Sequence, residues 1–64
     1  MKAYIMFLCD SPYGEYKKCD YGYVDGYVRG GNDVPCAVII LEKSERFVLA
    51  QLNHLSFIKY VNWK

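Results

Sequence analysis

The sequence has few of the residues that hold small chains together through metals or disulfides. It contains one histidine, His54, and no cysteine lies near it along the chain. Because structural zinc needs four ligands, usually in closely spaced pairs, we expect no metal site. The three cysteines, Cys9, Cys19 and Cys36, form no C-x-x-C pair, and their odd number leaves at least one unpaired. Free thiols in a reducing cytoplasm are therefore expected, with a Cys9–Cys19 bridge beside a free Cys36 as the alternative.

The sequence also lacks a long apolar run and a strong charge of either sign. The apolar run at residues 3–9 is far shorter than the roughly 20 residues that span a membrane. No small-residue cleavage pattern follows it, so a signal peptide is not expected. The formal net charge of +1 is too small to attract extended duplex nucleic acid without specific contacts. We therefore expect a cytoplasmic protein that binds neither membranes nor duplex nucleic acid.

The length of 64 residues allows a single domain, residues 1–64. A domain of this size buries only about 60% of the surface that its unfolded chain exposes. Small domains compensate with disulfides, metals or self-association, and the first two are not expected here. A hydrophobic content of 53% leaves apolar surface for an interface, so a homo-oligomer is expected.

Apolar runs separated by turn residues predict five strands. They are expected at residues 1–9, 21–30, 34–41, 46–52 and 57–61. A long polar loop at residues 10–20 follows the first strand, and residues 36–52 form the clearest hairpin, with a four- or five-residue turn. Residues 53–56 are long enough for one helical turn, which Asn53 can cap.

Residues 21–30 alternate with a period of two, which is typical of a strand with two different faces. Glycine and valine occupy the even positions, and regular glycines inside a strand indicate bending or close backbone approach. The odd positions predict one large amphipathic face, which consists of Tyr21, Tyr23, Asp25, Tyr27 and Arg29.

This order of elements resembles the SH3-like small barrel. The residues that carry the resemblance are the bent strand at 22–28, the hairpin at 36–52 and the short turn at 53–55. The resemblance implies an all-β fold, a small five-stranded SH3-like barrel with a single short helical turn near residues 53–56. The tryptophan pair of proline-binding SH3 domains is absent, since the third strand opens with Val34, Pro35 and Cys36 and the only tryptophan is Trp63.

The chain also resembles compact, tyrosine-rich barrels of bacteriophages and mobile elements, some of which inhibit host defence systems. That resemblance implies a non-enzymatic module that binds and inhibits a host protein, in the host cytoplasm if a phage encodes it. The alternative is an oligomeric sponge that sequesters a nucleotide or a cyclic oligonucleotide signal. No cofactor is expected for either function.

The candidate binding residues are the tyrosine face and the long loop. Side chains at i and i+2 of a strand stand about 6.6–6.8 Å apart, so Tyr21 and Tyr23 could grip a flat ring while Arg29 supplies a charge. The same tyrosines could instead form a protein interface or pack in the core. In the loop, the candidates are Tyr13, Tyr16 and Lys17, since loops on small domains often carry function.

Catalysis is not expected from the sequence. A Cys–His pair needs both side chains within hydrogen-bond reach, an orienting group and a pocket. A small barrel fills its own interior with side chains, so His54 is expected to have a structural or surface role.

Overall fold

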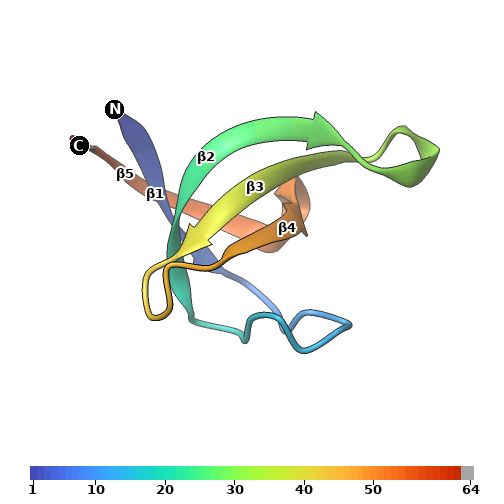
Figure 1. Cartoon of the computed structure of the whole chain (residues 1–64), viewed down its shortest axis with the longest axis horizontal. Coiled ribbons are helices and arrows are strands. Elements are labelled where there is room, and N and C mark those ends of the chain that lie inside the picture. Colours follow the sequence, from blue (N-terminus) through green and yellow to red (C-terminus); the bar gives the residue numbers. More distant parts are fainter. Residues whose placement is uncertain (63–64) are drawn as a thin grey trace.

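In a computed structural model that describes residues 1–62, five antiparallel strands form one sheet (Figure 1). The strands are β1 (Lys2–Phe7), β2 (Tyr21–Arg29), β3 (Pro35–Leu41), β4 (Phe47–Gln51) and β5 (Leu55–Val61). Two single 3₁₀ turns, η1 (Gly31–Asp33) and η2 (Leu52–His54), interrupt them. The predicted all-β class, the five strands and a short helical turn before the last strand are confirmed. That turn begins one residue earlier than predicted, so Asn53 lies inside it and does not cap it, and η1 is a second turn that was not predicted. The tail at Trp63 lies outside the described residues.

The strand order across the sheet is β4-β3-β2-β1-β5. The β3–β4 hairpin has the predicted short turn, residues 42–46, between its two strands. The sheet is not closed into the predicted barrel, because β4 and β5 are its two edges and do not pair with each other. The loop between β1 and β2 contributes the buried side chain of Tyr16 to the core.

A β-bulge bends β2 in its middle. The pairing of β2 with β3 shifts between Val24 and Gly26, so Asp25 is an extra residue in the ladder. Bulges increase strand twist and bend the bulged strand, and in Figure 1 β2 and β3 arch together over the rest of the sheet. Gly22, before the bulge, lies so close to Ile39 that it has no room for a side chain.

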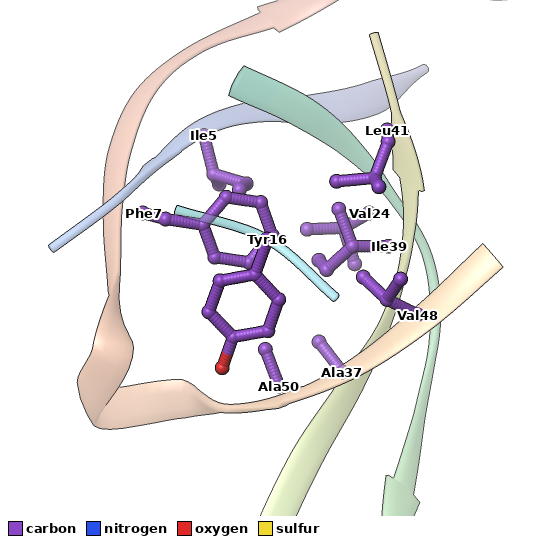
Figure 2. Packing of buried hydrophobic residues seen from close by; sticks show 9 residues of the cluster. All are labelled: Ile5, Phe7, Tyr16, Val24, Ala37, Ile39, Leu41, Val48 and Ala50. Carbon is purple, nitrogen blue, oxygen red and sulfur yellow. The ribbon is translucent and has the colours of Figure 1, made fainter. Parts of the chain in front are cut away.

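The core lies on the concave side of the bent sheet. Its buried members come from β1, β2, β3, β4 and the long loop, and Figure 2 shows them converging on one another. They are Ile5, Phe7, Tyr16, Val24, Ala37, Ile39, Leu41, Val48 and Ala50. Phe7 and Tyr16 stack with their ring centroids 4.0 Å apart and their planes at 20°. Phe7 and Ile39 are the largest fully buried side chains among the described residues.

The described cysteines Cys9, Cys19 and Cys36 are all free thiols. Among residues 1–62, no three His, Cys, Asp or Glu side chains gather in a way that could hold a metal ion. The same residues include no helix that is long and apolar enough to cross a membrane.

Candidate functional site

A groove of about 530 Å³ lies between β4 and the long loop, and we call it the edge groove. Residues 47–51 form one wall and loop residues of the 11–16 segment form the other, with further contributions from Cys36, Val38 and His54. In Figure 1 this loop runs below β4. The volume falls within the range of about 300–1,000 Å³ that is usual for ligand pockets.

The edge groove follows the free edge of β4 rather than one face of the sheet. All five residues of β4 line it, although successive side chains of a strand point to opposite faces. A groove over one face would be lined by every second residue. Because β4 is the last strand of the sheet on that side, its backbone edge is the feature that all five residues share.

The hydrogen-bond alternation of the β3–β4 ladder shows which backbone groups face the edge groove. The Leu41 N–H donates to the Arg46 carbonyl at 2.8 Å, so Leu41 and Arg46 form a hydrogen-bonded pair at the end of the ladder. Bonded positions recur every second residue in an antiparallel pair, so Val48 and Ala50 bond to β3. The N–H and C=O groups between and beside them, on residues 47, 49 and 51, point away from β3 toward the groove.

The edge groove is mainly apolar and carries several exposed large side chains. Tyr13, Phe47 and Leu49 expose 88%, 63% and 54% of their surface, yet all three line the same hollow. Among the described residues of its lining, Glu15 is the one aspartate, glutamate, lysine or arginine. An exposed apolar patch on a small soluble domain is a common mark of an interaction surface.

The loop wall is ordered by hydrogen bonds and by Tyr16. The Ser11 N–H donates to the Tyr16 carbonyl at 2.9 Å, and the Tyr13 N–H donates to Ser11 Oγ at 3.1 Å. Tyr16 itself is only 4% exposed because it packs in the core against Phe7. Burial raises the pKa of Tyr16, and charges on nearby Cys9 and Glu15 add to the effect. The predicted binding residue Tyr16 therefore anchors the loop.

His54 lies at the end of the edge groove, in the turn that joins β4 to β5. Its carbonyl accepts a hydrogen bond from the Leu8 N–H at 2.8 Å, which ties the turn to the start of the long loop. Its Nδ1 atom is buried and has no hydrogen-bond partner among the described residues. Its backbone thus holds the turn in place, as a structural residue would.

Tyr21 and Tyr23 lie on the convex face of the sheet, opposite the core, together with a third tyrosine from β1. The Tyr4 ring stacks on Tyr21 at 5.5 Å with an interplanar angle of 9°, and its centroid is 5.0 Å from that of Tyr23. Glu42 accepts hydrogen bonds from the Tyr4 and Tyr23 hydroxyls at 3.1 and 3.2 Å. We call these four residues the tyrosine cluster. It joins β1, β2 and the β3–β4 turn.

The tyrosine cluster also shifts the acidity of two of its members. Partial burial, followed by the hydrogen bond to Glu42, raises the pKa of Tyr4. Burial and the negative charge of Glu42 raise the pKa of Tyr23. Both hydroxyls therefore keep their protons to a higher pH than an ordinary tyrosine does, and with them the hydrogen bonds to Glu42.

The bulge in β2 divides the amphipathic face that the alternation predicted. Tyr23 pairs with Ile40 and Tyr27 pairs with Ala37, and residues 37 and 40 of an unbulged strand point to opposite faces. Tyr27, which is 69% exposed, therefore lies on the concave face, on the other side of the sheet from Tyr21. The prediction of one continuous face was wrong because the extra residue reverses the alternation.

The remaining predicted site residues are dispersed. Asp25 pairs with Lys2 at 2.7 Å on the convex face. Arg29 lines a shallow hollow with Tyr27 at the far end of β2. Lys17 is exposed in the long loop, where its N–H donates to Asp20 Oδ2 at 3.0 Å. Of the predicted set, the structure brings only Tyr13 and Tyr16 to the edge groove.

Sequence reasoning missed the main contributors to both sites. Phe47 and Leu49 were expected only as strand residues, and nothing in their run identifies β4 as an edge. Tyr4 and Glu42 join the tyrosine cluster through the register of distant strands. The one sign available in the sequence was that residues 47–51 contain no charge and no proline, the features that usually keep an edge strand from pairing with other chains.

Comparison of the chain with protein-family models, with curated proteins and with solved structures finds no match.

Proposed function

We propose that the chain is a non-enzymatic binding module whose partner is a protein held in the edge groove. The observation that carries the proposal is the hollow along β4. The exposed side chains of Phe47, Leu49 and Tyr13 line it beside the unpaired backbone edge of that strand. Aromatic and large aliphatic side chains that surround a concave site are the usual anchors of protein interfaces.

The proposal includes an SH3-like fold for this small domain. A long loop follows the first strand, the second strand is bent, and a single 3₁₀ turn separates the last two strands. These three features support the resemblance. Inhibition of a host defence protein by a phage-encoded chain, acting in the host cytoplasm, stays a prediction within the proposal.

The nucleotide alternative has less support. It needs an open gap between Tyr21 and Tyr23, but the ring of Tyr4 already contacts both. A flat ligand would have to displace that ring and the hydrogen bonds of its hydroxyl to Glu42. Sequestration of a nucleotide therefore stays a prediction that no contact in the tyrosine cluster favours.

Partner capture with two matched variants tests the proposed function. Leu49→Lys places a charge in the edge groove, and Ile58→Lys places the same charge on the other edge strand, at a residue 43% exposed against 54% for Leu49. Both proteins should keep the circular dichroism spectrum of the wild type. We expect Leu49→Lys to lose the protein that co-purifies from the native host and Ile58→Lys to retain it. The reverse result would place the partner elsewhere.

A further inference from the structure

We propose that the edge groove takes one extended segment of the partner, which adds to β4 as a sixth strand and carries a basic residue toward Glu15. This inference rests on the proposed function and specifies how the partner is recognised. It follows from three features of the groove: the open backbone edge, the second wall and the charge of the lining.

The first feature is the difference between the two edges of the sheet. The pairing of β5 with β1 contains a register shift beside Ile58, and Lys59 follows it. Bulges and lysines are devices by which edge strands avoid pairing with other chains. The pairing of β4 with β3 runs without a shift, and residues 47–51 include no charge and no proline. Only the β4 edge is therefore suited to receive another strand.

The second feature is the geometry of the open edge. The backbone groups on residues 47, 49 and 51 face the groove, so an added strand can bond to three residues of β4. Five residues at a rise of about 3.4 Å give a docking edge of roughly 17 Å. Strand addition of this kind supplies affinity through main-chain hydrogen bonds and specificity through alternate side chains. Phe47 and Leu49 present those side-chain contacts on one face.

The second wall distinguishes a single segment from a second copy of this chain. An added strand would have β4 on one side and loop residues 11–16 on the other. A second copy paired through its own β4 would need its β3 about 4.8 Å beyond that strand, on the side where the loop stands. A single extended segment meets no such obstacle, so we assign the groove to a segment of a partner protein.

The third feature is the charge of the lining. Glu15 is exposed at the loop wall and forms no ion pair with a described lysine or arginine. The β4 wall is uncharged. The complementary segment is therefore apolar where it meets Phe47 and Leu49 and carries a lysine or arginine toward the loop. Such a segment differs from a proline-rich ligand, since proline cannot donate to a strand ladder.

A display library of random peptides, selected against the wild-type protein, is the probe that tests this inference. We expect selection of extended apolar sequences with a basic residue. Leu49→Lys should abolish their binding. Glu15→Gln should weaken it by about two- to fivefold, the range for an exposed ion pair. Ile58→Lys is the matched control and should bind as the wild type does.

Amide hydrogen exchange then identifies the mode of binding. In the free protein the amides of Phe47 and Leu49 should exchange fast, while those of Val48 and Ala50, which bond to β3, should be protected. The selected peptide should slow exchange at residues 47, 49 and 51 by about tenfold or more, with little change at 48 and 50.

Each other outcome overturns a distinct part of the inference. Binding that depends on Leu49 without protection of residues 47, 49 and 51 would reject strand addition and leave the proposed function intact. Protection that rises with protein concentration in the absence of peptide, together with a dimer in sedimentation, would assign the edge to a second copy. Failure to select any Leu49-dependent peptide would reject an extended segment as the ligand. The proposed function fails separately, if Leu49→Lys and the wild type capture the same host protein.

Discussion

Replacing Gly22 by alanine tests how closely β2 and β3 approach before the bulge. A Cβ atom on Gly22 would lie 2.5 Å from Ile39 Cγ2 and 2.8 Å from the Ile40 carbonyl oxygen. Neither neighbour can move freely, because Ile39 is fully buried and branched at Cβ and the carbonyl belongs to the backbone of β3. Gly26, four residues along the same strand, has no atom within 4 Å of the corresponding position.

The two glycines therefore predict opposite effects for the same substitution. Overpacking a close-packed site costs about 1–3 kcal/mol and occasionally more, and two contacts below 3 Å place Gly22→Ala at or above the upper end. Chains of this size have a total stability of roughly 3–10 kcal/mol, so this variant should lose a large part of its stability. Gly26→Ala should leave stability unchanged or raise it by about 0.4–1 kcal/mol, since alanine restricts the unfolded chain.

Urea and thermal unfolding of both variants, followed by circular dichroism, measure these differences. For a domain of this length, about 3 kcal/mol corresponds to a drop in Tm of more than roughly 12 °C. Equal stability of Gly22→Ala and Gly26→Ala would refute the close approach of β2 and β3. A loss of stability confined to Gly26→Ala would also contradict the position of the bulge.

Three further predictions concern titratable side chains. Because the pKa of Tyr16 is raised in the folded protein, its contribution to stability is complete below about pH 10.0 and is lost as the pH rises further. Above about pH 10.0, the free energy of unfolding should therefore fall less steeply with pH for Tyr16→Phe than for the wild type. Glu42→Gln should lower the pKa values of Tyr4 and Tyr23, because it removes a negative charge beside both hydroxyls. Alkaline titration followed by phenolate absorbance checks this, and a titration curve identical to that of the wild type would contradict the tyrosine cluster. His54→Phe should keep or raise stability in urea, since Nδ1 is buried without a partner; a loss above about 2 kcal/mol would show an undetected hydrogen bond.

The strands were predictable because their signals are local. The apolar runs at residues 34–41 and 46–52, with a short charged turn between them, identify the hairpin without reference to the rest of the chain. The polar interruption between two apolar runs predicted a turn at residues 53–56, and the structure places it at Leu52–His54. The closed barrel was not a local property, since closure depends on whether the distant strands β4 and β5 meet.

The candidate sites depended on features that a single sequence does not display. One extra residue at Asp25 moved Tyr27 to the other face, and the alternating sequence around it gives no sign of a bulge. Tyr16 lies among polar residues, so its burial against Phe7 could not be read from its neighbours. The open edge of β4 follows from strand order, which a sequence pattern does not fix.

The tyrosine cluster and the edge groove have different roles. On the convex face, the Tyr4 ring packs against Tyr21 and Tyr23, and Glu42 accepts hydrogen bonds from the Tyr4 and Tyr23 hydroxyls. These contacts connect β1, β2 and the β3–β4 turn. Along the β4 edge, Phe47 and Leu49 are exposed around a hollow, which suits a surface that another protein covers. Substitutions in the tyrosine cluster should therefore act mainly on stability, and those in the edge groove mainly on binding.

Site-specific photo-cross-linking in the native host tests the central claim most directly. Benzoylphenylalanine placed at position 49, inside the edge groove, reports the protein that lies against β4, and the same group at position 58 reports the opposite edge. We predict one discrete cross-linked partner from position 49, lost when Tyr13→Ala and Phe47→Ala are added, and none from position 58. A partner cross-linked from position 58 alone would contradict the assignment of the edge groove as the binding site.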